Sequence, residues 1–213
     1  MMIHGYPEMY VSRAQARIGC AFDYAINVCR ISGTFFVDLF NVSRISKAIE
    51  RGDPAYLLGK SGIELAICIF DELNAPIERQ SPEDRLIRTP EYWIGWSITY
   101  YQWHSGRSFH QIFDALPFDV LQKMYHPLHE ADISKVVDVF DSKVREHFPD
   151  VNLKRLRKQL NLTQAELADR SGVSLRSIQM YEQRNKDINK ASVETVYRLS
   201  KALYCRVEDL IER

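Results

Sequence analysis

The sequence contains little cysteine and no excess of charge of either sign. Its 213 residues include four cysteines, and no two of them form a CxxC pair or another metal-binding spacing: Cys20, Cys29, Cys68 and Cys205. We therefore expect reduced thiols in a helical core, with neither a disulfide framework nor a metal site. Lys and Arg number 28 and so do Asp and Glu, which makes the formal net charge zero.

Long hydrophobic runs are also absent. No uncharged apolar run approaches the roughly 18 residues that a membrane-spanning helix needs. The first residues, MMIHGYPEMYVSR, lack the basic segment followed by an apolar one that marks a secretion signal. These absences predict a soluble, cytoplasmic protein with no membrane partner.

The chain lacks an alternating apolar pattern long enough for a β-strand, and helical periodicity dominates throughout. Ser61 with Glu64 forms a capping box, and Thr89-Pro90-Glu91 is typical of a helix start. The pattern predicts an all-α protein. In its N-terminal part we expect helices at residues 10–29, 36–49 (interrupted), 63–73, 90–104, 108–115, 117–125 and from 133 onward.

The neutral net charge hides an asymmetry between the two ends of the chain. Residues 150–213 hold 13 Lys or Arg and 9 Asp or Glu, a net of +4, whereas residues 1–149 hold 15 and 19, a net of −4. Phe148-Pro149 ends a predicted helix near the point where the sign changes. We therefore place a boundary at residues 147–151, between domains 1–148 and 149–213. A basic module on an acidic body is typical of nucleic-acid contact at one end.

The C-terminal module has a specific spacing of small, turn and apolar residues. A first amphipathic helix over residues 153–160 is followed by Thr163, which forms a capping box with Glu166. The small Ala168 permits close helix packing, Gly172 suits a sharp turn, and Ile178 faces inward on the next helix. This is the spacing of a helix-turn-helix.

With LTQAELA before the turn and SIQMYEQ after it, residues 151–213 closely resemble the Xre/Cro/cI-type helix-turn-helix family of bacterial and phage repressors. The resemblance implies a five-helix, lambda-repressor-like DNA-binding domain, with its fourth helix at 191–203 and its fifth at 207–212. It also implies a double-stranded DNA operator as partner. Because one such domain reads only a short half-site, we expect a homodimer. We expect no cofactor.

The third helix of this module, residues 174–183, is the predicted recognition helix. Arg176 and Met180 lie opposite the inward Ile178, Gln183 lies near them, and Gln179 lies on the flank. These four side chains are suited to reading base edges in the major groove. Each of them is alternatively a solvated surface residue. Ser174 caps this helix. The complete candidate DNA-binding set is Gln164, Ser174, Arg176, Ser177, Gln179, Met180, Gln183, Arg184, Asn185 and Lys186.

The resemblance assigns further roles around this helix. Gln164 matches the family's backbone-contacting glutamine, and Arg184-Asn185-Lys186 forms a basic loop where the family touches the phosphate strand. The alternative reading of that loop is plain solubility. Arg157 and Glu182 match a structural ion pair of the family, so Arg157 is not counted as a DNA contact.

The N-terminal part carries no catalytic constellation, and we predict that the protein is not an enzyme. Leu58-Gly59-Lys60-Ser61-Gly62 lacks the upstream glycine and the strand of a phosphate-binding loop. Four aromatic residues form a stripe at helical spacing: Trp93, Trp96, Tyr100 and Trp103. We predict that this stripe is core or a partner surface rather than a cofactor site. The group of His126, His129, Glu130 and Asp132 lacks a metal-ligand spacing.

Segments such as Glu91-Tyr92-Trp93, Tyr101-Gln102-Trp103 and 128–133 resemble uncharacterised helical regions attached to Xre domains in Firmicutes, some from toxin–antitoxin loci. We therefore predict a transcriptional repressor whose N-terminal domain serves dimerisation, partner binding or effector sensing. The alternative is an antitoxin whose N-terminal domain neutralises a toxin while the C-terminal domain controls the operon. A third class, an enzyme targeted by its helix-turn-helix, lacks a catalytic site in the sequence.

Overall fold

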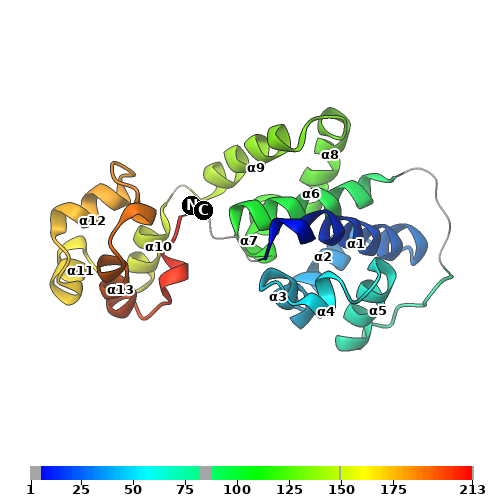
Figure 1. The fold of residues 1–213 in the computed structure, drawn as a ribbon, viewed down its shortest axis with the longest axis horizontal. Helices are drawn as coiled ribbons and strands as arrows, with labels where there is room; N and C mark the ends of the chain where they lie inside the picture. The colour runs from blue at the N-terminus through cyan, green and yellow to red at the C-terminus, as the bar shows by residue number, and fades with distance from the viewer. Residues whose placement is uncertain (1–5, 82–87, 149, 213) are drawn as a thin grey trace. The chain divides into compact units, whose positions relative to one another are not determined.

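The computed structural model describes residues 6–81, 88–148 and 150–212, and all regular structure in these ranges is helical. The predicted all-α fold is thus confirmed. The chain divides into two compact units, residues 1–147 and 148–213 (Figure 1). Every helix in the described ranges is too short or too polar to cross a membrane.

The N-terminal unit contains nine α-helices within the described residues. After the 3₁₀ turn η1 (Glu8–Tyr10) come α1 (Val11–Asp23), which continues as the π-helical turn η2 (Tyr24–Val28), α2 (Gly33–Val42), α3 (Arg44–Glu50), α4 (Pro54–Leu57), α5 (Gly62–Glu72), α6 (Pro90–Ser105), α7 (Phe109–Ala115), α8 (Phe118–Leu128) and α9 (Ile133–His147).

Local signals explain several of these boundaries. The Ser61–Glu64 capping box opens α5, so the segment that superficially resembles a phosphate loop is a helix start. The Thr89 hydroxyl accepts the Tyr92 N–H at 3.1 Å and begins α6. Ser43 ends α2 and caps α3, which accounts for the predicted interruption. Helix α8 runs past its predicted end and includes Pro127 in its last turn.

Helices α1 and α6 form the centre of this unit and approach each other through two glycines. A Cβ atom on Gly95 would lie 2.7 Å from the Ile18 carbonyl oxygen and 2.9 Å from the Cα of Gly19. A Cβ on Gly19 would lie 2.9 Å from the Tyr92 carbonyl oxygen. The backbones therefore pack directly against each other, which only glycine permits at these positions.

Aromatic side chains fill the space beside this contact. Phe22 of α1 packs edge-on against Phe36 of α2, with ring centroids 4.9 Å apart. Trp93 and Trp103 of the predicted stripe are buried, and the Trp103 Nε1 donates a 2.8 Å hydrogen bond to the Tyr6 carbonyl oxygen. Trp96 and Tyr100 are half-buried. The stripe is thus largely core.

The structure also places the four cysteines and the histidines that the sequence analysis considered as metal ligands. All four cysteines are free and half-buried, rather than fully buried. The His129 ring stacks on Tyr125, with centroids 4.5 Å apart, and its Nδ1 lies 3.1 Å from the His126 carbonyl oxygen. In the part of the chain that the structure describes, no group of three or more His, Cys, Asp or Glu residues is arranged to hold a metal ion.

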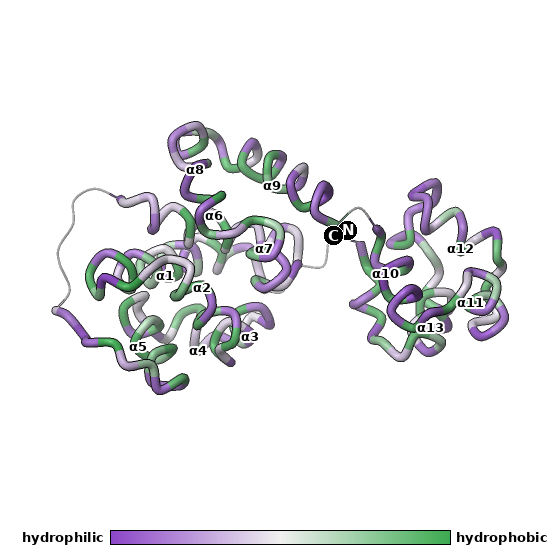
Figure 2. Tube along the Cα trace, turned by 180° about the vertical axis from the view of Figure 1, so that it is seen from behind, coloured by the Kyte–Doolittle hydropathy of each residue, from purple (hydrophilic) through white to green (hydrophobic). Residues whose placement is uncertain are grey.

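The C-terminal unit comprises α10 (Asn152–Gln159), α11 (Gln164–Ser171), α12 (Leu175–Glu182), the 3₁₀ turn η3 (Ile188–Lys190), α13 (Val193–Ala202) and the 3₁₀ turn η4 (Val207–Asp209). Hydrophobic and hydrophilic residues alternate along these helices (Figure 2). The buried apolar side chains form one core: Val151, Leu153, Leu162, Leu167, Val173, Ile178, Tyr181, Ile188, Val196, Leu199, Leu203 and Leu210.

The segment at 207–212, expected as a fifth helix, is only a single 3₁₀ turn. Residues beyond it use their backbone groups elsewhere: the Ile211 carbonyl oxygen accepts from Asn152 Nδ2 at 2.9 Å, and the Glu212 N–H donates to Asn189 Oδ1 at 2.9 Å. These bonds take the place of a continuing helical ladder.

Candidate nucleic-acid interface

The turn between α11 and α12 is built from local signals. Gly172 has φ +67°, and its N–H donates to the Ala168 carbonyl oxygen at 2.8 Å, which ends α11 in a left-handed cap. The Ser174 hydroxyl then accepts the Ser177 N–H and caps α12. The two hydroxyls lie 2.9 Å apart, so both predicted serines take part in the start of α12.

The start of α11 is fixed by the Thr163–Glu166 capping box. The Thr163 N–H donates to Glu166 Oε2 at 2.7 Å, and the Thr163 hydroxyl accepts the Glu166 N–H at 3.1 Å. The Thr163 hydroxyl also donates to Glu166 Oε2 at 2.8 Å. The two hydrogen bonds that Thr163 donates to Oε2 lower the pKa of the Glu166 carboxyl group, which is therefore ionised beside the positive end of the helix dipole.

Helix α12 has one buried and one solvent-facing side. Ile178 is fully buried in the core, whereas Arg176 and Gln183 are exposed and Gln179 and Met180 are half-buried. The four predicted base-reading residues therefore all reach the surface of the unit, on a helix whose opposite side is fixed by the core.

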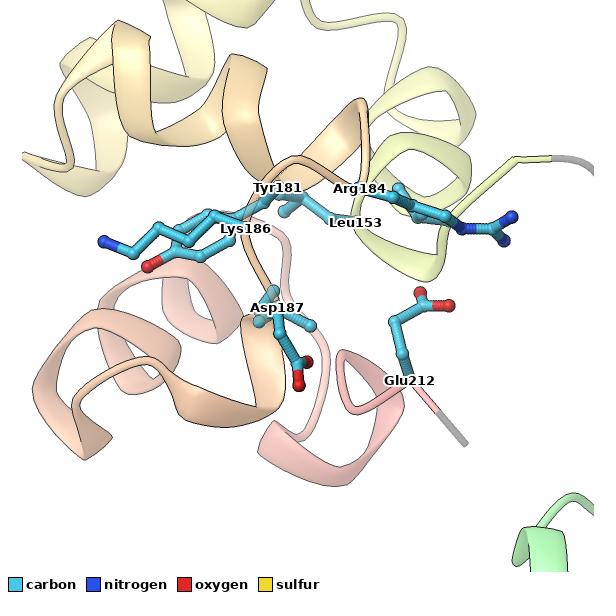
Figure 3. A pocket seen from close by; sticks show the side chains of 8 residues that line it. Leu153, Tyr181, Arg184, Lys186, Asp187 and Glu212 are labelled. Atoms are coloured by element: carbon cyan, nitrogen blue, oxygen red, sulfur yellow. The ribbon is translucent and has the colours of Figure 1, made fainter.

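The basic loop after α12 presents its cations in two directions. Arg184 adopts a left-handed conformation, with φ +59°. Its side chain extends away from that of Lys186 (Figure 3), and the Lys186 Nζ lies 5.4 Å from the centroid of the Tyr181 ring. Asn185 Nδ2 donates to Gln183 Oε1 at 3.1 Å, which ties the loop to the end of α12.

A pocket of about 230 Å³ lies beneath this loop. Its floor is part of the hydrophobic core, and its rim carries charges of both signs (Figure 3). The apolar lining consists of Val151, Leu153, Tyr181 and Ile188, and the charged lining of Arg184, Lys186, Asp187 and Glu212.

The structure brings Arg157 and Glu182 together as a buried ion pair. Arg157 Nε lies 2.6 Å from Glu182 Oε1 and Nη2 lies 2.8 Å from Oε2, while Nη1 donates to the Leu162 carbonyl oxygen at 2.6 Å. The side chains are only 11% and 2% exposed. Hydrogen bonding to Glu182 raises the pKa of Arg157 further. The pair connects α10, the α10–α11 loop and α12.

Gln164 is part of the same network. Its Nε2 donates to Glu182 Oε2 at 2.8 Å, so the first residue of α11 is tied to the last residue of α12. One Nε2 hydrogen and the amide oxygen remain for another partner. No local pattern indicates this bond, because Gln164 and Glu182 lie 18 residues apart along the chain.

Glu212, near the end of the described residues, joins α10 to η3. Val151, the N-cap residue of α10, supplies no capping side chain. The Glu212 carboxylate instead accepts the Asn152 N–H, and Asn189 Nδ2 donates to the Glu212 carbonyl oxygen. A residue 60 positions away along the chain therefore caps α10.

Two short helices joined by a tight turn, with the second exposed along one side, define a helix-turn-helix. Residues 153–210 match the family model described as helix-turn-helix, so the chain carries an Xre/Cro/cI-type domain of this family, and this domain implies DNA binding. Comparisons with curated proteins and with solved structures gave no significant match.

Proposed function

We propose that this protein is a sequence-specific transcriptional repressor that reads the DNA major groove with α12. The observation that carries the proposal is the helix-turn-helix domain at 153–210. Arg176, Gln179 and Met180 reach the surface on its second helix, and Gln183 reaches it at the C-cap of that helix. An Arg side chain pairs with two acceptors of guanine, Gln pairs with adenine, and an apolar Met contacts the thymine methyl group.

Contacts to the sugar–phosphate backbone set the register of α12. Gln164 offers an amide hydrogen at the N-terminus of α11, where backbone N–H groups and the helix dipole favour a phosphate. Further polar or cationic groups lie at the start of α12 and in the loop after it: Ser174, Ser177, Arg184, Asn185 and Lys186. Because Arg184 and Lys186 point apart, we assign Lys186 to one phosphate and Arg184 to a separate contact.

One such domain reads a short half-site, so we propose a homodimer on an operator with two-fold symmetry. Its half-sites lie roughly 34–36 Å apart, which is one turn of DNA. The N-terminal unit contributes dimerisation, partner binding or effector sensing.

A specific surface favours a second candidate function, that of an antitoxin. On α2, Phe35 and Val42 are exposed and Leu39 is half-buried, and the three lie along one side of the helix. This apolar strip belongs to the acidic N-terminal unit and suits contact with another protein. The test is co-expression with a toxin encoded beside this gene. Restored growth with the unsubstituted chain, and no restored growth with Phe35→Asp, would support the antitoxin function.

The principal test of the repressor is selection of duplexes from a random pool by the full chain. We expect a recurrent sequence, with affinity that falls as salt rises. Transcription in vitro from a promoter containing that sequence should decrease when the protein is added. Absence of any enriched sequence would overturn specific DNA binding, and increased transcription would overturn repression.

A further inference from the structure

Helix α13 exposes an apolar strip that its own unit does not use. Val193 is 82% exposed and Tyr197 52%, while the core side of the helix is formed by Val196 and Leu199. At about 100° per residue, Tyr197 lies about 40° around the helix from Val193, so both face the same way. Large apolar side chains left in water contribute no burial to the unit.

Tyr204 extends the exposed apolar surface beyond the end of α13. It is 84% exposed and has φ +53°, the left-handed conformation that favours glycine after a helix. The bonds around it are those of a helix cap, with the Cys205 N–H donating to the Ser200 carbonyl oxygen at 3.0 Å. A tyrosine here is therefore neither buried nor conformationally favoured, which indicates that its role lies outside the unit's own fold.

The charges along the strip are self-complementary. Glu194 lies near the start of α13 and Lys201 near its end. Both lie about 80–100° around the helix from Val193, on the same side of Tyr197. The Lys201 Nζ lies 5.3 Å from the Tyr197 ring centroid. If two copies of α13 pack antiparallel about a two-fold axis next to position 197, Glu194 of each copy faces Lys201 of the other.

We propose that this surface, the α13 face (Val193, Glu194, Tyr197, Lys201 and Tyr204), binds the same face of a second copy of this chain. The inference rests on the proposed function, because two-fold operator recognition requires two helix-turn-helix domains in a fixed relation. A single helix pair buries less area than a stable solution interface does. The contact is therefore weak between free molecules and strong on DNA, where two adjacent half-sites raise the effective concentration.

Charge exchange on the full chain tests the two-fold pairing. Cooperativity is measured as the ratio of affinities for a selected duplex with two half-sites and for one with a single half-site. Because each substitution occurs twice in the interface, Glu194→Lys and Lys201→Glu should each reduce this ratio about ten-fold. The double variant should restore it to within about three-fold of the original. Lys143→Glu, which makes the same charge change as Lys201→Glu but on α9 of the N-terminal unit, should leave it unchanged.

Loss of stability does not explain that pattern. Glu194→Lys removes the ion pair with Arg198 in both the single and the double variant, so a folding defect would persist in the double variant. Tyr204→Gly separates the two effects further: we expect a higher melting temperature, because glycine suits φ +53°, together with a lower cooperativity ratio.

A cross-link tests the contact independently of DNA. Position 197 lies beside the proposed axis, so Tyr197→Cys should form a disulfide-linked dimer under mild oxidation at high protein concentration. Ala165→Cys on exposed α11, and the unsubstituted chain with its four cysteines, should not. Failure to cross-link, or a double charge variant as impaired as the single variants, overturns the proposal that the α13 face binds a second copy, even if DNA binding is intact. Failure to select any duplex overturns the proposed function but leaves the cross-link as a test of the face.

Discussion

Glu182 holds Gln164 at 2.8 Å while forming two hydrogen bonds with Arg157. The carboxylate that stabilises the buried ion pair therefore also orients the amide at the start of α11. Because Nε2 has two hydrogens, one remains for another partner while the other binds Glu182. The Arg157–Glu182 pair stabilises the fold, and its carboxylate also positions Gln164, a candidate phosphate contact.

Gln164→Ala should weaken binding to selected and scrambled duplexes alike. The lost group is neutral, so the dependence of log K on log salt should keep its slope. Stability should change little, since Glu182 keeps both bonds to Arg157. Fluorescence anisotropy at two or more salt concentrations measures both quantities, and a loss confined to the selected duplex would contradict a backbone role.

Arg157→Ala should act through folding. It leaves Glu182, 2% exposed, as a buried charge without its main partner, which costs about 3–5 kcal/mol. We expect a clear fall in the melting temperature of the C-terminal unit, which calorimetry measures. Below that transition the residual folded protein should bind DNA with near-normal affinity, and a large affinity loss at full folding would make Arg157 a DNA contact.

Arg176→Ala tests base reading by α12. The loss on the selected duplex should be on the order of 1–3 kcal/mol, with relaxed preference at one base pair and little change on a scrambled duplex. A repeat of the duplex selection with the variant identifies that position. Equal weakening of both duplexes would instead make Arg176 a phosphate anchor, and base reading would fall to Gln179, Met180 or Gln183.

Lys186→Ala provides the electrostatic counterpart. Removal of one phosphate contact should weaken all duplexes alike and reduce the salt slope by about one. Lys190→Ala, which removes an exposed cation from η3 beyond the loop, is the matched control. If both variants change the slope equally, the effect reflects general charge rather than a defined contact.

Gly95→Ala should destabilise the N-terminal unit. The new methyl group would meet the backbone of α1 at 2.7 Å, and overpacking costs about 1–3 kcal/mol. For comparison, the Cβ of Gly172→Ala would meet only Arg198 Nη1 at 3.5 Å, so its cost arises from the left-handed backbone. Calorimetry should assign the two losses to different units, and an unchanged melting temperature for Gly95→Ala would contradict the close α1–α6 contact.

Short-range features of the fold were accessible from the sequence. The Ser61–Glu64 box, the Thr89 cap and Gly172 in the turn act within a few residues, so their patterns specify local geometry directly. The side of α12 that reaches the surface also follows from helical periodicity, because the core position Ile178 fixes the rotation of the helix.

Long-range features were not accessible in this way. The approach of Gly19 to Gly95, the bond from Gln164 to Glu182 and the capping of α10 by Glu212 each join distant parts of the chain. Neither residue of such a pair has a local pattern that indicates the other. The directions of Arg184 and Lys186 depend on a left-handed residue for which arginine is an unusual choice.

The capping of α10 by Glu212 affects the order in which the two units can fold during synthesis. The first residue of α10 is synthesised 60 residues before its cap. All of α1 to α9 has by then been synthesised, so the acidic unit can fold while the basic one is still incomplete. A nascent chain stalled before residue 211 should therefore carry a finished N-terminal unit and an unfinished DNA-binding unit, which delays operator binding until synthesis of the unit ends.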